Sequence, residues 1–104
     1  MHEISVRDLA ELLRRGIDLI LLDVREPQEY AIARLEGILI PLRELPQRLA
    51  ELPQGREIVV YCHHGVRSRA ATRFLLESGF ERVRNLTGGI DAWAAEIEPR
   101  MPRY

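Results

Sequence analysis

The sequence predicts an α/β fold, with a small, mainly parallel five-stranded sheet and helices on both faces. Short apolar runs alternate along the chain with stretches of helical periodicity, which is typical of parallel sheets built from strand–helix–strand units. The clearest runs, 19–22 and 58–61, are apolar or aromatic at each position, as expected for strands buried on both faces. The 104 residues fit a single domain over 1–104, with a core of about 4–97 and a loose C-terminal tail at 98–104.

The N-terminal third contains the first two predicted strands. Ile4 ends a short strand, and Ser5 is a good N-cap for the helix that follows. Gly16 ends this helix, whose apolar stripe comprises Val6, Leu9, Ala10 and Leu13. Residues 19–22 form the second strand, and 27–30 form a short helical turn.

The middle of the chain contains two further strands. Residues 38–40 form a short strand that ends before a proline, and a helix is expected over about 46–52 because proline is favoured in a first helical turn. Residues 58–61 form the fourth strand. Ser68 can cap a helix that ends at Gly79, with an apolar face made of Ala70, Ala71, Phe74 and Leu75.

The last strand is expected over 83–86. Gly88 and Gly89 lead from it into a helix whose apolar stripe comprises Ile90, Trp93, Ala94 and Ile97, and the period of this stripe indicates that Trp93 is a core residue. In open parallel sheets ligands bind beyond the carboxyl ends of the strands. Four residues follow strand ends and should therefore meet at that edge: Asp23, Arg25, Cys62 and Arg67.

The charge balance restricts the partners of this chain. Fifteen basic residues face sixteen acidic ones, for a net charge of −1 at pH 7, which argues against a general nucleic-acid-binding protein. Residues 1–8 lack the basic and then apolar pattern of a signal peptide, and the longest strongly apolar run, 19–22, is too short to cross a bilayer. We therefore expect a cytoplasmic protein with no nucleic-acid or membrane partner.

The chain has one cysteine, Cys62, so an internal disulfide is excluded and the thiol is free. Free thiols persist in reducing compartments. Cys62 ends the fourth strand and opens a loop that runs through His63, His64, Gly65, Val66 and Arg67 into Ser68.

This loop has the composition of an anion cradle for a nucleophile. The thiolate is the reactive form of cysteine, so a site that uses it must stabilise the anion. Backbone N–H groups, the positive end of the following helix and the charge of Arg67 can each do so, and Gly65 allows the positive φ that a tight cradle needs. From local chemistry alone, an inert thiol buried at a strand end is an equally good interpretation.

Three segments together resemble the signatures of single-domain rhodaneses. They are Leu-Asp-Val-Arg-Glu at 22–26, Tyr-Cys-His-His-Gly-Val-Arg-Ser at 61–68 and Asn-Leu-Thr-Gly-Gly-Ile-Asp-Ala-Trp at 85–93. Their order and spacing match the family, and the resemblance extends from about Ile4 to Ile97.

The resemblance implies a sulfurtransferase that forms a persulfide on Cys62. Its thiolate would take sulfane sulfur from a donor such as thiosulfate or a protein persulfide, and a thiophilic acceptor such as cyanide or a thiol would remove it. A protein sulfur donor or acceptor is a possible partner, and no metal or organic cofactor is required. A sulfur-carrier module with little turnover on small donors would show the same signatures.

The loop length favours sulfur over phosphate. Related phosphatases hold phosphate in a Cys-x5-Arg loop, whereas four residues separate Cys62 from Arg67 here. A smaller ring of amides suits one sulfur atom, so a cysteine-dependent phosphatase is the weaker alternative.

Three further residues in or near these segments have open roles. By resemblance, the segment with Asp23 and Arg25 supports the loop, with Asp23 the better candidate to hydrogen-bond there; a simple exposed pair is the alternative. Members of the family often have His-Ile-Pro-Gly-Ala before the third strand, where this chain has Arg-Leu-Glu-Gly-Ile at 34–38. Arg34 is interpreted as a surface residue, although it could attract an anionic donor.

The two adjacent histidines do not indicate a metal site. Neighbouring residues rarely bind one ion well, and no second Cys/His pair lies at zinc spacing. We expect the backbone amides of His63 and His64 to line the cradle and their side chains to shape its entrance. A protonated histidine there would add positive charge at mildly acidic pH.

Overall fold

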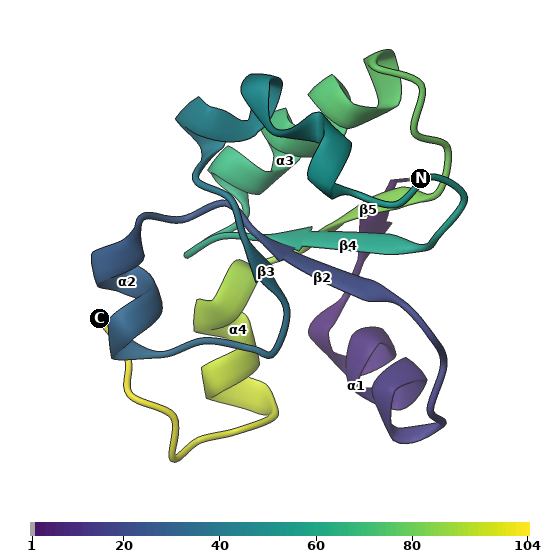
Figure 1. The fold of residues 1–104 in the computed structure, drawn as a ribbon. Coiled ribbons are helices and arrows are strands. Elements are labelled where there is room, and N and C mark those ends of the chain that lie inside the picture. Colours follow the sequence, from purple (N-terminus) through teal and green to yellow (C-terminus); the bar gives the residue numbers. More distant parts are fainter. Residues whose placement is uncertain (1) are drawn as a thin grey trace.

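The computed structural model describes residues 2–104 and contains one sheet between two layers of helices (Figure 1). The sheet has five strands in the order β1-β5-β4-β2-β3, and each neighbouring pair is parallel. The strands are β1 (Glu3–Ile4), β2 (Ile20–Asp23), β3 (Ile38–Leu39), β4 (Ile58–Tyr61) and β5 (Val83–Leu86). The predicted fold class is confirmed, and the bounds of the five strands differ from the predicted ones by at most one residue.

The helices cover both faces of this sheet. On one face lie α3 (Val66–Glu77) and two short 3₁₀ helices, η1 (Leu42–Gln47) and η2 (Leu49–Glu51). On the other face lie α1 (Val6–Arg14) and α4 (Gly89–Glu96), and the short α2 (Pro27–Ile32) lies near the C-terminus of the chain (Figure 1). None of the helices within residues 2–104 is long and apolar enough to span a membrane.

Strand β4 is central and its side chains alternate between two cores. Ile58 and Val60 belong to the cluster under α3, and Cys62 continues that alternation beyond the strand end. Val59 and Tyr61 belong to the cluster under α1 and α4, which also contains Trp93, as predicted. The exposed fraction of Cys62 is only 1%, because its side chain points into the α3 side of the core.

Two predicted elements differ in the structure. Strand β2 includes Asp23 in place of Leu19, because the Asp23 carboxylate is neutralised inside the fold and the ladder therefore extends to it. The helix expected over 46–52 is replaced by η1 and η2, with Pro46 inside η1. Bonds such as Arg48 N–H to Leu45 O close three-residue turns there, and this tighter form tolerates the missing proline N–H.

Helix α3 buries Ala71 and Leu75 as predicted, but its buried face is rotated relative to the rest of the prediction. Ala70 is exposed and Phe74 half-buried, while Ser68 and Thr72 lie in the interior beside Ala71 and Leu75. The two hydroxyls can be buried because each has a partner; Thr72 Oγ1, for example, donates to Ser68 O at 2.8 Å. The side of α3 that is buried therefore contains two polar residues as well as two apolar ones.

The C-terminal tail, predicted to be loose, lies against the domain. Met101 packs on the core cluster, and Arg103 forms an ion pair with Asp91 at 3.0 Å. The Tyr104 ring stacks on His63 with 3.9 Å between ring centroids. Arg103 and Tyr104 thus hold the tail against the domain, which its composition did not predict.

Candidate active site

The sheet brings the predicted site residues to one edge. Asp23 and Tyr61 are register partners at the carboxyl ends of β2 and β4, and Val24 N–H donates to Tyr61 O at 3.1 Å. Cys62 follows directly. The segment with Asp23 therefore lies beside the first residue of the Cys62 loop (residues 62–68), as the parallel topology predicts.

Three hydrogen-bond donors surround the sulfur of Cys62. The backbone N–H of Gly65 lies 3.1 Å from Sγ, the backbone N–H of Ser68 lies 3.4 Å away and the Ser68 hydroxyl 3.3 Å away. Among the described residues, His63 and His64 donate no backbone hydrogen bond to Sγ, so the lining of the cradle by their amides stays a prediction. The cradle is formed by the second half of the loop.

The cradle coincides with the first turn of α3. Gly65 caps this helix with a φ of 103°, a conformation that favours glycine. Ser68, predicted as the cap, lies inside the first turn with its hydroxyl at the sulfur. Unpaired N–H groups of a helix start point along its axis, so the helix end faces Sγ with partial positive charge. Val66, by contrast, points outward and is 71% exposed.

Asn85 of β5 is a site residue that the sequence reasoning missed. Its Nδ2 donates to Gly65 O at 3.3 Å and to the Glu3 carboxylate at 3.1 Å, so its Oδ1 is left to accept the Ser68 hydroxyl. A hydroxyl has one proton, so Ser68 donates to either Asn85 or Cys62 at a given time. A thiol can donate to Ser68, whereas a sulfur anion requires the Ser68 proton. The signal was present, since Asn85 opens the third family signature.

The start of α4 supports the loop from the other side. Ile90 N–H donates to Cys62 O at 2.9 Å, and Asp91 N–H donates to His63 O at 3.0 Å. Gly89 has a φ of 62°, and a Cβ there would overlap the carbonyl oxygens of Cys62 and His63. Glycine at this position therefore allows the helix end and the loop to approach closely.

Arg67 does not face the sulfur as an unpaired cation. Its guanidinium forms two hydrogen bonds to Glu29 of α2, at 2.7 and 2.9 Å. Hydrogen bonds from Arg67 lower the pKa of Glu29 from 4.5 to about 2, against the opposing effect of burial. Sequence reasoning missed Glu29; the one signal was its place in a Glu-x-x-Glu capping box just after a strand end.

Glu29→Gln is expected to lower the free energy of unfolding at pH 7 by about 1–3 kcal/mol, a range discounted for the partial exposure of Arg67. The folded-state pKa lies below the unfolded one, so this stabilisation is complete above about pH 4.5 and is lost as the pH falls toward 2. Urea unfolding of the wild type and of Glu29→Gln at several pH values between 2 and 7 measures the difference in their free energies of unfolding. A difference that stays constant down to pH 2 would show that the charge of Glu29 contributes nothing.

Asp23 and Arg25 form a buried ion pair with each other. Arg25 Nη2 lies 2.7 Å from Asp23 Oδ2, and the side chains are 0% and 1% exposed, which rules out the exposed pair. In the described part of the chain the Asp23 carboxylate accepts hydrogen bonds from Arg25 and none from residues 62–68, so its support of the loop stays a prediction. Arg25 makes a connection to Glu29, because it donates to Tyr104 Oη at 2.9 Å, and Tyr104 donates to Glu29 at 3.0 Å.

The two histidines lie in an aromatic stack. His63 is placed between Tyr104 and His64, with 3.9 Å between its ring centroid and each neighbour. Burial lowers the pKa of His63, and the neighbouring His64 lowers this pKa further. Candidate donor atoms of His63, His64 and Asp91 lie within 4.8 Å of one another. The two rings are nearly parallel rather than convergent, and Asp91 already pairs with Arg103, so the absence of a metal stays our prediction.

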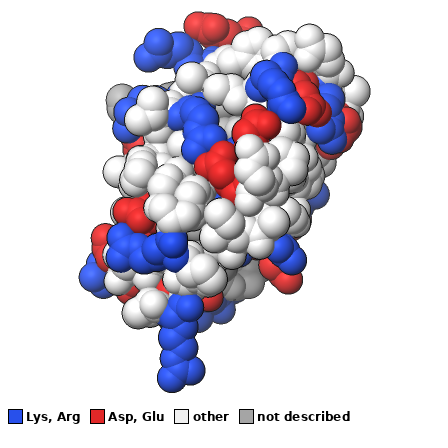
Figure 2. All heavy atoms as spheres, turned by 90° about the vertical axis from the view of Figure 1, so that its left-hand side faces the viewer, with Lys and Arg blue, Asp and Glu red and all other residues white. Residues whose placement is uncertain are grey.

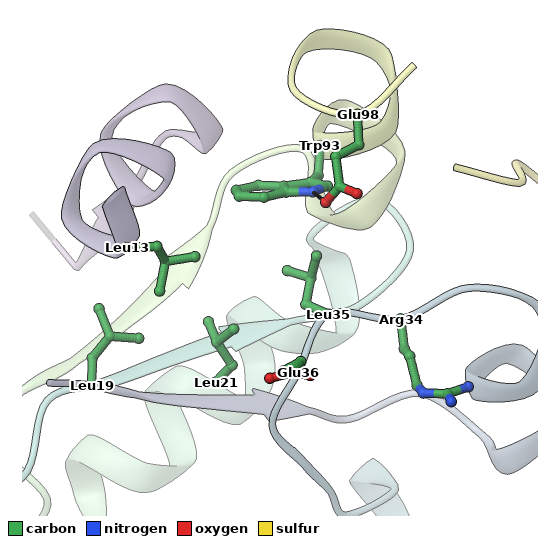
Figure 3. Close-up of a pocket in the computed structure, with 8 residues that line it drawn as sticks. All are labelled: Leu13, Leu19, Leu21, Arg34, Leu35, Glu36, Trp93 and Glu98. Carbon is green, nitrogen blue, oxygen red and sulfur yellow. Dashed lines mark hydrogen bonds between the residues drawn. The ribbon is translucent and has the colours of Figure 1, made fainter. Parts of the chain in front are cut away.

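A cavity of about 550 Å³ lies on the α1 and α4 side of the sheet (Figure 3). Trp93 and four leucines line it together with Arg34, Glu36 and Glu98, whereas Cys62 and the rest of its loop do not. Arg34 is exposed there, with its guanidinium 4.7 Å from the Tyr30 ring centroid. This position agrees with Arg34 as a surface residue.

Known proteins resemble this chain in sequence and in fold. A family model of the rhodanese-like domain matches residues 5–96. The chain belongs to the rhodanese-like family. A sulfurtransferase of Allochromatium vinosum is 38% identical over 95 residues, which cover 90% of this chain and 89% of that protein. The structure of a rhodanese-related protein from Thermoplasma volcanium has a TM-score of 0.86 at 34% identity and covers 95% of this chain and 96% of that one.

The rhodanese-like domain also matches part of longer proteins. An adenylyltransferase and sulfurtransferase of Arabidopsis thaliana is 33% identical over 118 residues, covering 97% of this chain. The chain spans only 25% of that relative's length. The resemblance seen in the three sequence signatures is thus confirmed at the level of the family and its fold.

Proposed function

We propose that this rhodanese-like domain transfers sulfane sulfur through a persulfide on Cys62. The observation that supports it best is the sulfur itself, a lone cysteine Sγ that receives hydrogen bonds from Gly65 N–H and from the N–H and hydroxyl of Ser68. Donors aimed at one atom stabilise an anion there. The relative from Allochromatium vinosum, named a sulfurtransferase, supports the same reaction class.

The proposed reaction has two displacements. In the first, the Cys62 thiolate attacks the outer sulfur of a donor, a new S–S bond forms, and the donor's own S–S bond breaks with its electron pair leaving on the remainder. Sulfite leaves when the donor is thiosulfate. In the second, an acceptor thiolate or cyanide attacks the outer sulfur of the Cys62 persulfide and the Cys62 thiolate leaves, which restores the site.

The loop residues have distinct proposed roles in these steps. Gly65 and Ser68 stabilise the sulfur anion before and after loading. Asn85 holds the Ser68 hydroxyl and the Gly65 carbonyl, while His63, His64, Val66 and the Arg67–Glu29 pair form the surroundings of the entrance. The buried pair of Asp23 and Arg25 supports this edge of the sheet. The reaction as proposed needs no metal or organic cofactor, and a free thiol of this kind suits a reducing compartment such as the cytoplasm.

A carrier function is the alternative, favoured by the burial of Cys62 at 1% exposure and by the match to a quarter of a longer sulfurtransferase. In that case a protein persulfide would load Cys62 and a protein acceptor would unload it, with slow turnover on small donors. Steady-state rates with thiosulfate and with the persulfide form of a cysteine desulfurase distinguish the carrier from the enzyme, because a carrier should be slow with thiosulfate.

Intact-mass spectrometry tests the persulfide directly. After exposure to a sulfur donor and removal of excess reagent, the protein is expected to gain about 32 mass units, the mass of one sulfur atom, and peptide mapping should place it on Cys62. Addition of cyanide should remove the increment and release one equivalent of thiocyanate. A protein that gains no mass from thiosulfate, from a thiosulfonate or from a desulfurase persulfide would contradict the proposal.

A further inference from the structure

The cations around the Cys62 loop are matched by carboxylates. Arg67 pairs with Glu29 and Arg25 with Asp23, each at 2.7 Å. The same holds for the neighbouring surface, where the pairs are Arg43–Glu26, Arg69–Glu3 and Arg103–Asp91. Figure 2 shows the end of the molecule where α2 and the C-terminus lie, and basic and acidic side chains alternate there instead of gathering into one positive area.

Glu29 is held at Arg67 more firmly than a surface carboxylate. Besides the two bonds from Arg67, it accepts the Tyr104 hydroxyl at 3.0 Å and the Glu26 backbone N–H at 3.0 Å. Its side chain is 16% exposed. Four donor groups thus hold both carboxylate oxygens of Glu29 in place. An incoming anion must displace this firmly held carboxylate before it can bind Arg67.

Sulfur donors of this reaction differ in charge. Thiosulfate is a dianion, whereas a thiosulfonate such as methanethiosulfonate offers the same outer sulfur with one negative charge, and a small persulfide group also has at most one. An unpaired Arg67 would attract the dianion more strongly than the monoanion, while a neutral Arg67–Glu29 pair removes that advantage.

We propose that Glu29 is a specificity-determining residue that, by neutralising Arg67, makes the site select monoanionic sulfur donors such as persulfides over the thiosulfate dianion. This inference rests on the proposed sulfur transfer through Cys62. Glu29 acts through Arg67 and touches no reacting atom.

The two donor reactions are balanced and differ only in the leaving group. With thiosulfate, the Cys62 thiolate bonds to the outer sulfur, the S–S bond to the sulfonate sulfur breaks, and sulfite departs with the electron pair. With methanethiosulfonate the same bonds form and break, and methanesulfinate departs. In both cases Cys62 becomes a persulfide anion and the acceptor thiolate later regenerates it, so no external oxidant or reductant is needed.

The test compares the kcat/KM for thiosulfate with the kcat/KM for methanethiosulfonate, with one acceptor thiol. In Glu29→Gln the ratio of the two is expected to rise about tenfold over wild type, mainly through a lower KM for thiosulfate. Glu26→Gln is the matched control, because it removes the same charge from the neighbourhood of α2 but takes it from the exposed Arg43, which keeps Glu44 as a partner, and its ratio should change by less than about twofold. An unchanged ratio in Glu29→Gln, or equal changes in both variants, would overturn the proposal.

A second measurement needs no variant and decides the matter if Glu29→Gln does not fold. In wild type, raising the ionic strength from about 0.05 M to about 0.3 M should leave the thiosulfate kcat/KM level or higher, since no net positive charge attracts the dianion. A steep fall for thiosulfate, larger than for methanethiosulfonate, would overturn the proposal. If neither donor adds sulfur to Cys62 in any protein, the proposed function itself fails; sulfur addition by both donors with an unaltered preference overturns only the role of Glu29.

Discussion

Replacement of Cys62 by serine is expected to abolish sulfur transfer, with a loss in kcat/KM of at least about 10³-fold for each donor. Cys62 is the only sulfur nucleophile that the loop offers, and a serine hydroxyl neither ionises near neutral pH nor forms a stable bond to sulfane sulfur. Steady-state assays with thiosulfate and methanethiosulfonate measure the loss, and intact mass should show no sulfur adduct.

The same variant should remain folded, which makes the result interpretable. The serine oxygen can accept the hydrogen bonds that Sγ receives from Gly65 and Ser68, so the free energy of unfolding should change by less than about 2 kcal/mol. Urea unfolding and far-UV circular dichroism provide this check. A folded Cys62→Ser protein that keeps a tenth or more of wild-type turnover would rule out the Cys62 persulfide.

Asp23→Asn is expected to destabilise the domain by about 3–5 kcal/mol, a large part of the stability of a domain this size. The change keeps the shape of the side chain but leaves the Arg25 charge unpaired where both side chains are almost fully buried. Urea unfolding at pH 7 measures the loss. The matched control is Asp18→Asn, since Asp18 is 80% exposed and pairs with a partly exposed Arg56; its cost should stay under about 1 kcal/mol.

If Asp23→Asn does not fold, the double variant Asp23→Asn with Arg25→Met tests the same idea. It removes the buried charge along with its partner, so it should recover part of the lost stability. If Asp23→Asn and Asp18→Asn lowered the free energy of unfolding by equal amounts, burial of the Asp23–Arg25 pair would not explain its contribution to stability.

Local patterns were sufficient to predict most of the fold. The all-apolar run at 58–61 required a strand buried on both faces, and β4 lies at the centre of the sheet as that pattern demands. Local patterns did not predict which polar residues are buried, because their hydrogen-bond partners are set by the folded chain. Ser68 and Thr72 were not part of the predicted apolar face, yet both are buried, because each hydroxyl has a hydrogen-bond partner in the folded chain.

The sequence predicted the site residues that are close to Cys62 in the chain, but not those that other helices and strands bring to it. Cys62, Gly65 and Ser68 are close in sequence, and the cradle they form follows from a strand end, a glycine with positive φ and a helix start. Glu29 and Asn85 were missed, because each reaches the loop from another element. Asp23 differs from these two residues, because its partner Arg25 is only two residues away and its side chain folds back onto the Asp23 carboxylate.

By itself the sequence determined the α/β class, the parallel sheet and a single cysteine placed at the end of a central strand. These follow from the periodicity of apolar residues and from backbone preferences, which act over a few neighbouring positions. Only the tertiary structure decided the electrostatic state of the site, in which Arg67 is neutralised by a glutamate 38 residues earlier in the chain. Coulomb and hydrogen-bond energies depend on distance through space, and folding alone sets that distance.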